Sequence, residues 1–528
     1  MILSRIANFS CALLLLVPTL FATDVVTYHN DNARTGQNTK ETLLTPLNVN
    51  ASTFGKLMTL SVDGIVDAQP LYLANVTIPG QGVHNVLYAA TENDSVYAFD
   101  ADTGTLYWQV SLVPAGQTPG DMVDGCNGIV PTIGVTSTPV IDRSSGPNGT
   151  IFVVGMTKDA LGNYHQYLHA LDVTTGAEEF SGPADIQAQY PGTGDNSQNG
   201  FVIFDPKQYV ARASLLLMNH VIYTAWASHC DARPYTGWII GYNENLIAGP
   251  VINVTPNGIQ GAIWQSGAGL AGDGTNIFLL DANGTFDDTF DSNGFPSQGD
   301  YGNGFIKLST ANKSLAVADY FNMYNTISES DSDSDLGSGG TLLLPPMKDS
   351  TGTLRNLAVA AGKDTNLYIV DRNNMGKFTP GFNNIWQEID RALPYGVWGA
   401  PAYFNGSLYY GPQRSKLMQF RFKQALLSTF PSSKSPTVFS YPGTTPCVSA
   451  NGNTNGIVWA IEHGKPGALS VLHAYSATTL GQELYNSNQA ANKRDSFGQA
   501  AHLTTPTVVN GKVYIGTLKS IAVFGLLQ

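Results

Sequence analysis

Short apolar segments separated by turn residues run along most of the chain. In YAFDADTGTLYW (97–108), Tyr97 and Phe99 alternate with small or polar neighbours, and the alternation resumes after Asp-Thr-Gly to end on Trp108. A two-residue period is typical of a half-buried β-strand. Because Gly104 can adopt the positive φ that the end of such a turn requires, the stretch predicts a β-hairpin.

The pattern recurs around prolines. Four short strands carry proline as their fourth residue: DAQPLYL from Asp67, TSTPVID from Thr136, WGAPAYF from Trp398 and LTTPTVV from Leu503. Each is followed by a turn, a second strand and a third strand. Degenerate copies of the first strand begin at Ala211, Gly261, Gly339 and Thr454. The chain therefore contains eight candidate repeat units.

The recurring proline indicates an edge strand, because proline lacks a backbone donor and is excluded from central strands. A β-propeller supplies that position in every blade, since the innermost strand of each blade faces the central channel. We therefore predict an all-β fold: a single eight-bladed β-propeller of four-stranded antiparallel blades over residues 23–528. The strand at 55–62 should pair with the last strand, at 520–528, and close the ring.

Composition supports this fold and limits the function. Hydrophobic residues make up 43% of the 528 residues and charged residues 13%, with 55 glycines, as expected for many short strands and tight turns. The net charge is -13, and no cluster of Lys and Arg is present to bind phosphates. This excludes a large nucleic-acid footprint.

The first 22 residues predict a secretory signal peptide, with Arg5 before an apolar run that ends near Ala22. A membrane anchor is the alternative, but the run is short for a span and contains Pro18. We expect an exported monomer, extracellular or periplasmic, without a membrane span. Glycosylation sequons, which also arise by chance in such a composition, begin at Asn50, Asn75, Asn93, Asn148, Asn253, Asn283, Asn312 and Asn405.

Three cysteines remain after cleavage of the signal peptide: Cys126, Cys230 and Cys447. An oxidising compartment permits one disulfide and leaves one thiol. Because Cys126 and Cys230 both lie in long loops, we predict that they form the disulfide.

The segment AFDADTGTLYW resembles the tryptophan-docking repeat of the pyrroloquinoline-quinone (PQQ) propeller family, in which the terminal tryptophan packs against the next blade. The resemblance covers nearly the whole mature chain as architecture, although only this copy matches closely. Both non-catalytic scaffolds and quinoprotein dehydrogenases share the repeat, so it implies a fold and not an activity.

The resemblance also implies what a dehydrogenase of this family requires. Its cofactor lies between a tryptophan and a disulfide of adjacent cysteines, next to a calcium bound by Glu, Asn and Asp, with an aspartate as base. This chain has no adjacent cysteines, although some quinoproteins dispense with them. Trp264 and Trp398 could provide the stacking face and Asp67 the base, while PQQ and calcium remain open as cofactors.

Ligands of propellers usually bind on the axis, so we examined the innermost strands and the loops before them. The ligand-binding candidates there are Gln69, Arg212, Trp264, Gln265, Trp398, Asn455 and His502, and the catalytic candidates are His29, Arg34 and Asp67. Arginine can bind an anionic oxygen, and indole rings can stack on a quinone or a sugar. The alternative is a water-filled channel whose polar lining only satisfies edge-strand backbone groups.

Acidic loops give a weaker metal hypothesis. Asp331, Asp333 and Asp335 alternate in SESDSDSDLGSGG, and alternating carboxylates can bind calcium, although the segment lacks an EF-hand's glycine and a solvated loop is the preferred interpretation. The sequence SHCD (228–231) and Lys363 are interpreted as structural, Lys363 as part of a hairpin turn.

The sequence therefore predicts, first, a non-catalytic scaffold that binds a glycan or a protein. Two alternatives remain: a PQQ- and calcium-dependent dehydrogenase that oxidises alcohols or sugars, and a carbohydrate-active hydrolase or lyase with an axial site.

Overall fold

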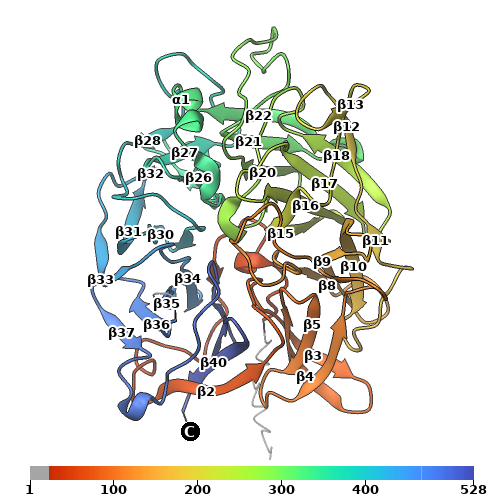
Figure 1. Cartoon of the computed structure of the whole chain (residues 1–528). Helices are drawn as coiled ribbons and strands as arrows, with labels where there is room; N and C mark the ends of the chain where they lie inside the picture. Colours follow the sequence, from red (N-terminus) through yellow and green to blue (C-terminus); the bar gives the residue numbers. More distant parts are fainter. Residues whose placement is uncertain (1–22, 465–466, 528) are drawn as a thin grey trace, which may run out of the picture.

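The computed structural model describes residues 23–464 and 467–527, so the predicted signal peptide lies outside the described residues. The chain forms mainly antiparallel sheets of four or five strands. Figure 1 shows these sheets following one another in chain order around a common centre, from β3–β5 through β15–β22 and β26–β33 to β34–β40. The chain is a β-propeller.

The sheets of the N-terminal half each use consecutive strands. They are formed by β3 (Leu71–Ile78), β4 (Gly82–Ala90), β5 (Ser95–Asp100) and β6 (Leu106–Ser111); by β8 (Val140–Asp142), β9 (Thr150–Lys158), β10 (Tyr164–Asp172) and β11 (Ala184–Asp185); by β15 (Tyr209–Met218), β16 (Val221–Ser228), β17 (Trp238–Asn243) and β18 (Ala248–Asn253); and by β19 (Ala271–Gly272), β20 (Asn276–Leu280), β21 (Gly304–Ser309) and β22 (Ala316–Asn322).

The C-terminal half continues the pattern. Its sheets are formed by β23 (Leu342–Leu343), β26 (Leu357–Ala360), β27 (Leu367–Asp371) and β28 (Gln387–Ile389); by β29 (Ala402–Phe404), β30 (Ser407–Tyr410), β31 (Ser415–Lys423) and β33 (Ser433–Phe439); by β34 (Cys447–Asn451), β35 (Thr454–Glu462), β36 (Val471–Ser476) and β37 (Glu483–Asn486); and by β38 (Thr507–Val509), β39 (Lys512–Gly516), β40 (Ser520–Leu526) and β2 (Phe54–Ser61).

Smaller elements lie beside these sheets or form short sheets of their own. Among them are β1 (Gln37–Asn38), parallel to β34; β7 (Thr118–Pro119), beside β9; β32 (Leu426–Leu427), beside β31; a sheet of β12 (Gln189–Pro191), β13 (Ser197–Gln198) and β14 (Phe201–Ile203); and the pair β24 (Met347–Lys348) and β25 (Leu354–Arg355). The described helices are short: α1 (Thr326–Asp331), and the 3₁₀ segments η1 (Tyr28–Asn30), η2 (Gln265–Gly267), η3 (Ala311–Lys313), η4 (Leu336–Ser338) and η5 (Ala491–Lys493). Within the described residues, no helix has the length and apolar character needed to cross a bilayer.

The repeated prolines occupy equivalent positions. Pro70, Pro139, Pro401 and Pro506 stand directly before β3, β8, β29 and β38, the first strand of each sheet. Each of these strands pairs with only one strand of its sheet, so the proline enters an edge and interrupts no ladder. The prediction that these segments form edge strands is confirmed.

The hairpin that carries the docking repeat is also confirmed. β5 and β6 pair with Ala98 opposite Trp108, and the turn between them contains Gly104 at φ 78°. Trp108 reaches the next sheet, where its indole N–H donates to the Val173 carbonyl at 3.2 Å. Gly176 has φ 71°, and a Cβ there would lie 2.7 Å from the Trp108 ring, so the turn needs glycine for two reasons.

Two degenerate copies of the inner strand were wrongly placed. The segment at Gly261 forms a loop and η2, and the first strand of that sheet is β19. The segment at Thr454 forms β35, a second strand, while the true first strand β34 follows Pro446 in TTPCVSA. This segment repeats LTTPTVV, so the proline signal was present in the sequence and was overlooked.

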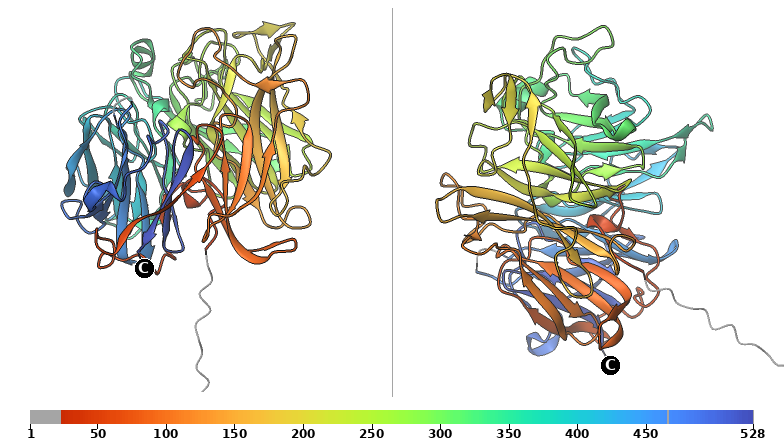
Figure 2. Two further views of the ribbon diagram at one scale, coloured as in Figure 1. Left: turned by 60° about the horizontal axis from the view of Figure 1, so that its bottom comes forward. Right: turned by 90° about the vertical axis from the view of Figure 1, so that its right-hand side faces the viewer.

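Strands from opposite ends of the chain share one sheet. β2 runs antiparallel to β40, with Phe54 opposite Leu526 and Ser61 opposite Ser520. Figure 2 shows the red β2 beside the blue C-terminal strands. Apolar residues of neighbouring sheets pack together into clusters; one contains Phe54, Trp459 and Phe524.

Candidate functional site

A cavity of about 510 Å³ lies where the inner strands begin. Arg212 enters it from β15, and Trp264, Trp398 and His502 enter it from segments preceding β19, β29 and β38. Four of the residues predicted to bind a ligand are therefore brought together. A cavity of this size can enclose a small organic molecule.

One side of the cavity is aromatic. The rings of Trp398 and Tyr441 are 5.6 Å apart, and those of Tyr441 and His502 are 5.2 Å apart. Trp264 lines the same cavity and is partly buried against apolar neighbours. Rings held in this way offer flat apolar surface to a planar ligand.

The predicted disulfide is present, and it lines the cavity. Cys126 and Cys230 are bonded, with Cα atoms 5.6 Å apart, and join two loops separated by 104 residues. The loop of Cys230 also supplies His229 and Asp231 to the lining. Cys447 is a buried free thiol at the start of β34.

An ion-pair network occupies another part of the lining. The Lys363 ammonium lies 2.7 Å from the Asp335 carboxylate and 2.5 Å from that of Asp333, which accepts a hydrogen bond from Asn283. Burial raises the pKa of Asp335, and the charge of Lys363 opposes this. Burial lowers the pKa of Lys363, but the two carboxylates outweigh it and raise the pKa overall. Lys363 therefore stays protonated at neutral pH.

This arrangement revises the metal hypothesis for the acidic loop. The carboxylates of Asp333 and Asp335 meet the Lys363 ammonium. Asp331 lies at the end of α1 and lines a separate groove with Asp333. Asp331 is thus separated from the other two carboxylates, because it ends a helix and they follow that helix.

The histidines of the cavity favour the neutral form. Burial lowers the pKa of His502, and the positive charge of Arg212 lowers it further, against a smaller opposite effect of Asp67. Burial also lowers the pKa of His229. Both imidazoles are therefore unprotonated at neutral pH, which is the form that a general base requires.

A carboxyl pair lies beside a smaller cavity of about 10 Å³, which is lined by Asp67, Gln69 and Arg212. Arg212 lines both cavities and so stands between them. Glu92 is buried, and burial together with the charge of Asp67 raises its pKa well above the usual range. Gly134 and Thr136 donate hydrogen bonds to one Glu92 oxygen, at 2.8 and 3.1 Å. Glu92 therefore favours the protonated, neutral form.

Three other ligand candidates lie outside the large cavity. Gln69 is buried, where it accepts from the His29 N–H at 3.0 Å and donates to Thr507 at 3.1 Å. Gln265 is buried and accepts from the Leu280 N–H at 3.0 Å. Asn455 is exposed at the β34–β35 hairpin, because its segment is a second strand and not an inner strand.

His29 and Arg34 belong to the N-terminal segment at residues 27–34, which is largely buried and is called the plug below. The Arg34 side chain is fully buried and donates to the carbonyls of Leu270, Leu215 and Tyr28 and to the Thr27 hydroxyl, at 2.7 to 3.0 Å. His29 is fully buried, and its ring stacks on Tyr28. Desolvation lowers the pKa of His29 to about 4. These contacts link the N-terminal segment to the inner strands.

The lining also contains residues that the sequence indicated as structural, namely Ser228 to Asp231 and Lys363. Asn283, which the sequence marked only as a glycosylation sequon, lines the cavity as well. The sequence did offer a signal for these lining residues. They follow the ends of strands, and those strand ends lie on the same face of the propeller as the starts of the inner strands.

No protein-family model and no curated protein matches the sequence. Solved structures match it in fold. The quinohemoprotein alcohol dehydrogenases from Comamonas testosteroni and Pseudomonas putida superimpose with TM-scores of 0.60 and 0.61, at 14% and 12% identity, over 95% and 96% of this chain and 80% of each of theirs. A europium-containing methanol dehydrogenase superimposes with a TM-score of 0.56 at 12% identity, over 96% of this chain and 98% of its own.

At such identities the similarity establishes architecture and leaves activity open. The chain has the β-propeller fold of these dehydrogenases, the fold that its docking repeat resembles.

Proposed function

We propose that the protein is an exported binding protein whose axial cavity holds a planar, anionic ligand of the PQQ class. This narrows the ligand of the scaffold from a glycan or protein to a small molecule. The observation that carries the proposal is the convergence of Trp264, Arg212, Lys363 and a disulfide on one cavity of about 510 Å³.

Each part of the lining suits one property of such a ligand. Trp264 and the wall of Trp398 and Tyr441 offer flat surface to a fused ring system. Arg212 can bind a carboxylate or quinone oxygen through paired N–H donors, since its guanidinium makes no hydrogen bond or ion pair within the described chain. Lys363 adds a second cation, and the disulfide adds an apolar surface.

The lining does not fit calcium. Calcium takes six to eight oxygen ligands, whereas the acids of the cavity are Asp231 and Asp335, and Asp335 is engaged by Lys363. The Asn283 side-chain oxygen is buried and unpartnered, but Arg212 places a positive charge in the same space. We therefore propose that the side-chain cations bind the anionic ligand without a metal ion.

A dehydrogenase is the second candidate, because the lining includes proton acceptors. When bound, PQQ supplies a two-electron oxidant for alcohols or sugars. Asp335 and the neutral His502 and His229 are the groups of this chain that could accept the hydroxyl proton of a substrate. The third candidate, a hydrolase using His29, Arg34 and Asp67, is not supported, since His29 and Arg34 are buried in the plug.

Titration with PQQ in the presence of EDTA tests the proposal. We expect saturable binding by calorimetry and a shift of the quinone absorbance, with Trp264→Ala and Arg212→Gln each weakening binding at least about tenfold, or about 1.4 kcal/mol. Arg391→Gln, at an exposed arginine, is the matched control and should bind as the unaltered protein does. Binding that requires added calcium, or no binding, would refute the proposal.

Reduction of an artificial electron acceptor by the PQQ-loaded protein in the presence of alcohols or sugars tests the second candidate. Binding of PQQ without dye reduction leaves the binding protein and eliminates the dehydrogenase.

We also propose that residues 23–528 form one eight-bladed ring closed by β2 and β40, and that the chain is a monomer. The pairing of these strands supports closure. Deletion of 54–61 should expose the edge of β40 and produce aggregation on size-exclusion chromatography, where the unaltered chain should elute as a monomer.

A further inference from the structure

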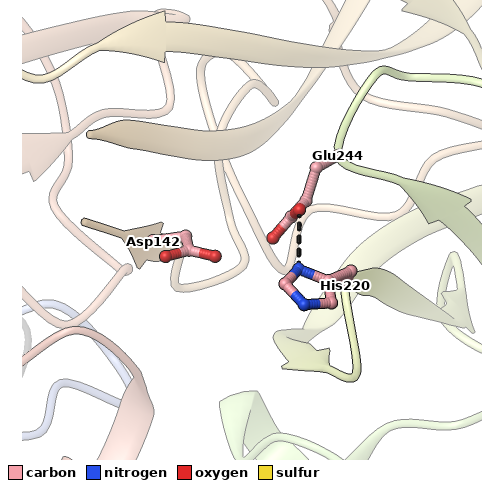
Figure 3. A group of neighbouring side chains, drawn as sticks. All are labelled: Asp142, His220 and Glu244. Carbon is pink, nitrogen blue, oxygen red and sulfur yellow. Dashed lines mark hydrogen bonds and ion pairs between the residues drawn. The ribbon is translucent and has the colours of Figure 1, made fainter. Parts of the chain in front are cut away.

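A second cluster of ligand-type side chains lies away from the axial cavity. It consists of Asp142, at the end of β8, His220, in the β15–β16 turn, and Glu244, in the β17–β18 turn (Figure 3). β15 begins beside the cavity, where Arg212 lines it, and ends at Met218, just before His220. At about 3.3 Å per strand residue, roughly 26 Å of strand separates the cluster from the cavity.

The three side chains converge. One ligand atom from each lies within 4.8 Å of those of the other two, and the His220 Nδ1 atom is 2.9 Å from a Glu244 oxygen. Asp142 uses one carboxylate oxygen to accept from the Ser144 N–H at 2.7 Å and the Ser144 hydroxyl at 2.6 Å. Its other oxygen remains for the cluster, and Figure 3 shows the Asp142 carboxylate directed toward the other two side chains.

The cluster contains one ligand position that the protein does not satisfy. The second Glu244 oxygen is buried and has no hydrogen-bond partner among the described residues. A buried carboxylate oxygen without a donor costs free energy, and a second carboxylate nearby adds repulsion. A bound cation would relieve both costs, since it would attract both carboxylates and coordinate the unpartnered oxygen.

We propose that Asp142, His220 and Glu244 form a binding site for a divalent cation of the zinc class. An imidazole nitrogen beside two carboxylates suits zinc, whereas calcium and magnesium prefer all-oxygen sites. Asp142 belongs to the sheet of β8–β11 and the other two residues to the sheet of β15–β18, so the ion links adjacent sheets. His220 is 78% exposed, which leaves a coordination position open to water.

Calorimetry with zinc chloride on the chelator-treated, dialysed full chain tests the site. We expect one saturable zinc per chain, and a melting temperature raised by about 2–3 °C at a hundredfold excess over the dissociation constant. Because His220 and Glu244 lie in turns, His220→Gln and Glu244→Gln should fold normally and weaken zinc binding at least about tenfold.

The matched control is His165→Gln. His165 also lies between two carboxylates, those of Asp159 and Asp185, but at 3.8 and 3.5 Å from different ring nitrogens. This variant should retain the affinity and the thermal shift. Calcium or magnesium at the same concentration should give neither.

Three results would overturn the proposal: no stoichiometric zinc, zinc binding unaltered by His220→Gln, or a thermal shift abolished equally by His165→Gln. The Glu244→Gln variant could also be more stable than the unaltered chain while neither protein binds zinc. That result would show that the carboxyl groups of Asp142 and Glu244 share only a proton. The test does not depend on the axial cavity, so it stands whether or not PQQ binds.

Discussion

Two arginines near the axis have different surroundings. The Arg34 guanidinium is fully buried in the plug and donates hydrogen bonds to three carbonyls and a hydroxyl. Arg212, on β15, lines both cavities, and its guanidinium makes no hydrogen bond or ion pair within the described chain. The comparison suggests that an arginine whose donors are all used inside the protein stabilises the fold, and that one with free donors in a cavity is available to a ligand.

The largest expected effect comes from removing the buried member of the pair. Arg34→Met should leave three carbonyls and a hydroxyl without their donor and lower the free energy of unfolding by at least about 4 kcal/mol. Denaturant unfolding monitored by tryptophan fluorescence would measure it. A loss below about 1 kcal/mol would contradict the structural role of Arg34.

The next effect concerns the wall of the cavity. The double variant Cys126→Ala with Cys230→Ala opens a loop of 104 residues and should lower the free energy of unfolding by about 2–4 kcal/mol. Mild reduction of the unaltered protein should do the same, with Cys447→Ala as the control that changes no disulfide. Unchanged stability would show that other contacts hold the wall of the cavity without the disulfide.

A smaller effect on the free energy of unfolding, which depends on pH, is expected at Glu92. Because the pKa of Glu92 is raised in the folded protein, its folded state keeps a proton that the unfolded chain releases, so stability falls as pH rises above about 4.5. Glu92→Gln removes this dependence and keeps an oxygen for Gly134 and Thr136. The variant should gain about 1–2 kcal/mol at pH 8 and much less at pH 5.

The smallest effect on stability is expected at Arg212. Arg212→Met should change the free energy of unfolding by less than about 0.5 kcal/mol, because no internal hydrogen bond is lost. Denaturant unfolding of Arg212→Met and Arg34→Met under identical conditions compares the contributions of the two arginines to stability directly. A large loss at Arg212 would show that its charge serves the fold, by offsetting Asp67 and Glu92.

The sequence predicted the repeat well, because proline and glycine impose local rules. Proline predicted the edge strands, and Asp-Thr-Gly predicted the hairpin that ends on Trp108. The docking of Trp108 on the next sheet followed from the same repeat. The inner strand at Cys447 was missed because its cysteine and serine broke the apolar pattern, although Pro446 marked it.

The cavity was predicted less completely. Arg212, Trp264, Trp398 and His502 were found because inner-strand starts must meet on the axis of a propeller. Lys363, Asp335 and Asn283 enter from other loops, whose paths depend on tertiary packing and have no local signature. Gln265 was misjudged because a 3₁₀ segment turns its amide into the core, where Leu280 binds it.

The pairing of β2 with β40 has a consequence for biosynthesis. A ribosome releases β40 only after all the intervening sheets, so β2 must wait unpaired while those sheets form. Nascent chains and products shortened at the carboxyl terminus would then expose the same hydrogen-bonding edge, which makes them natural targets for chaperones and proteases.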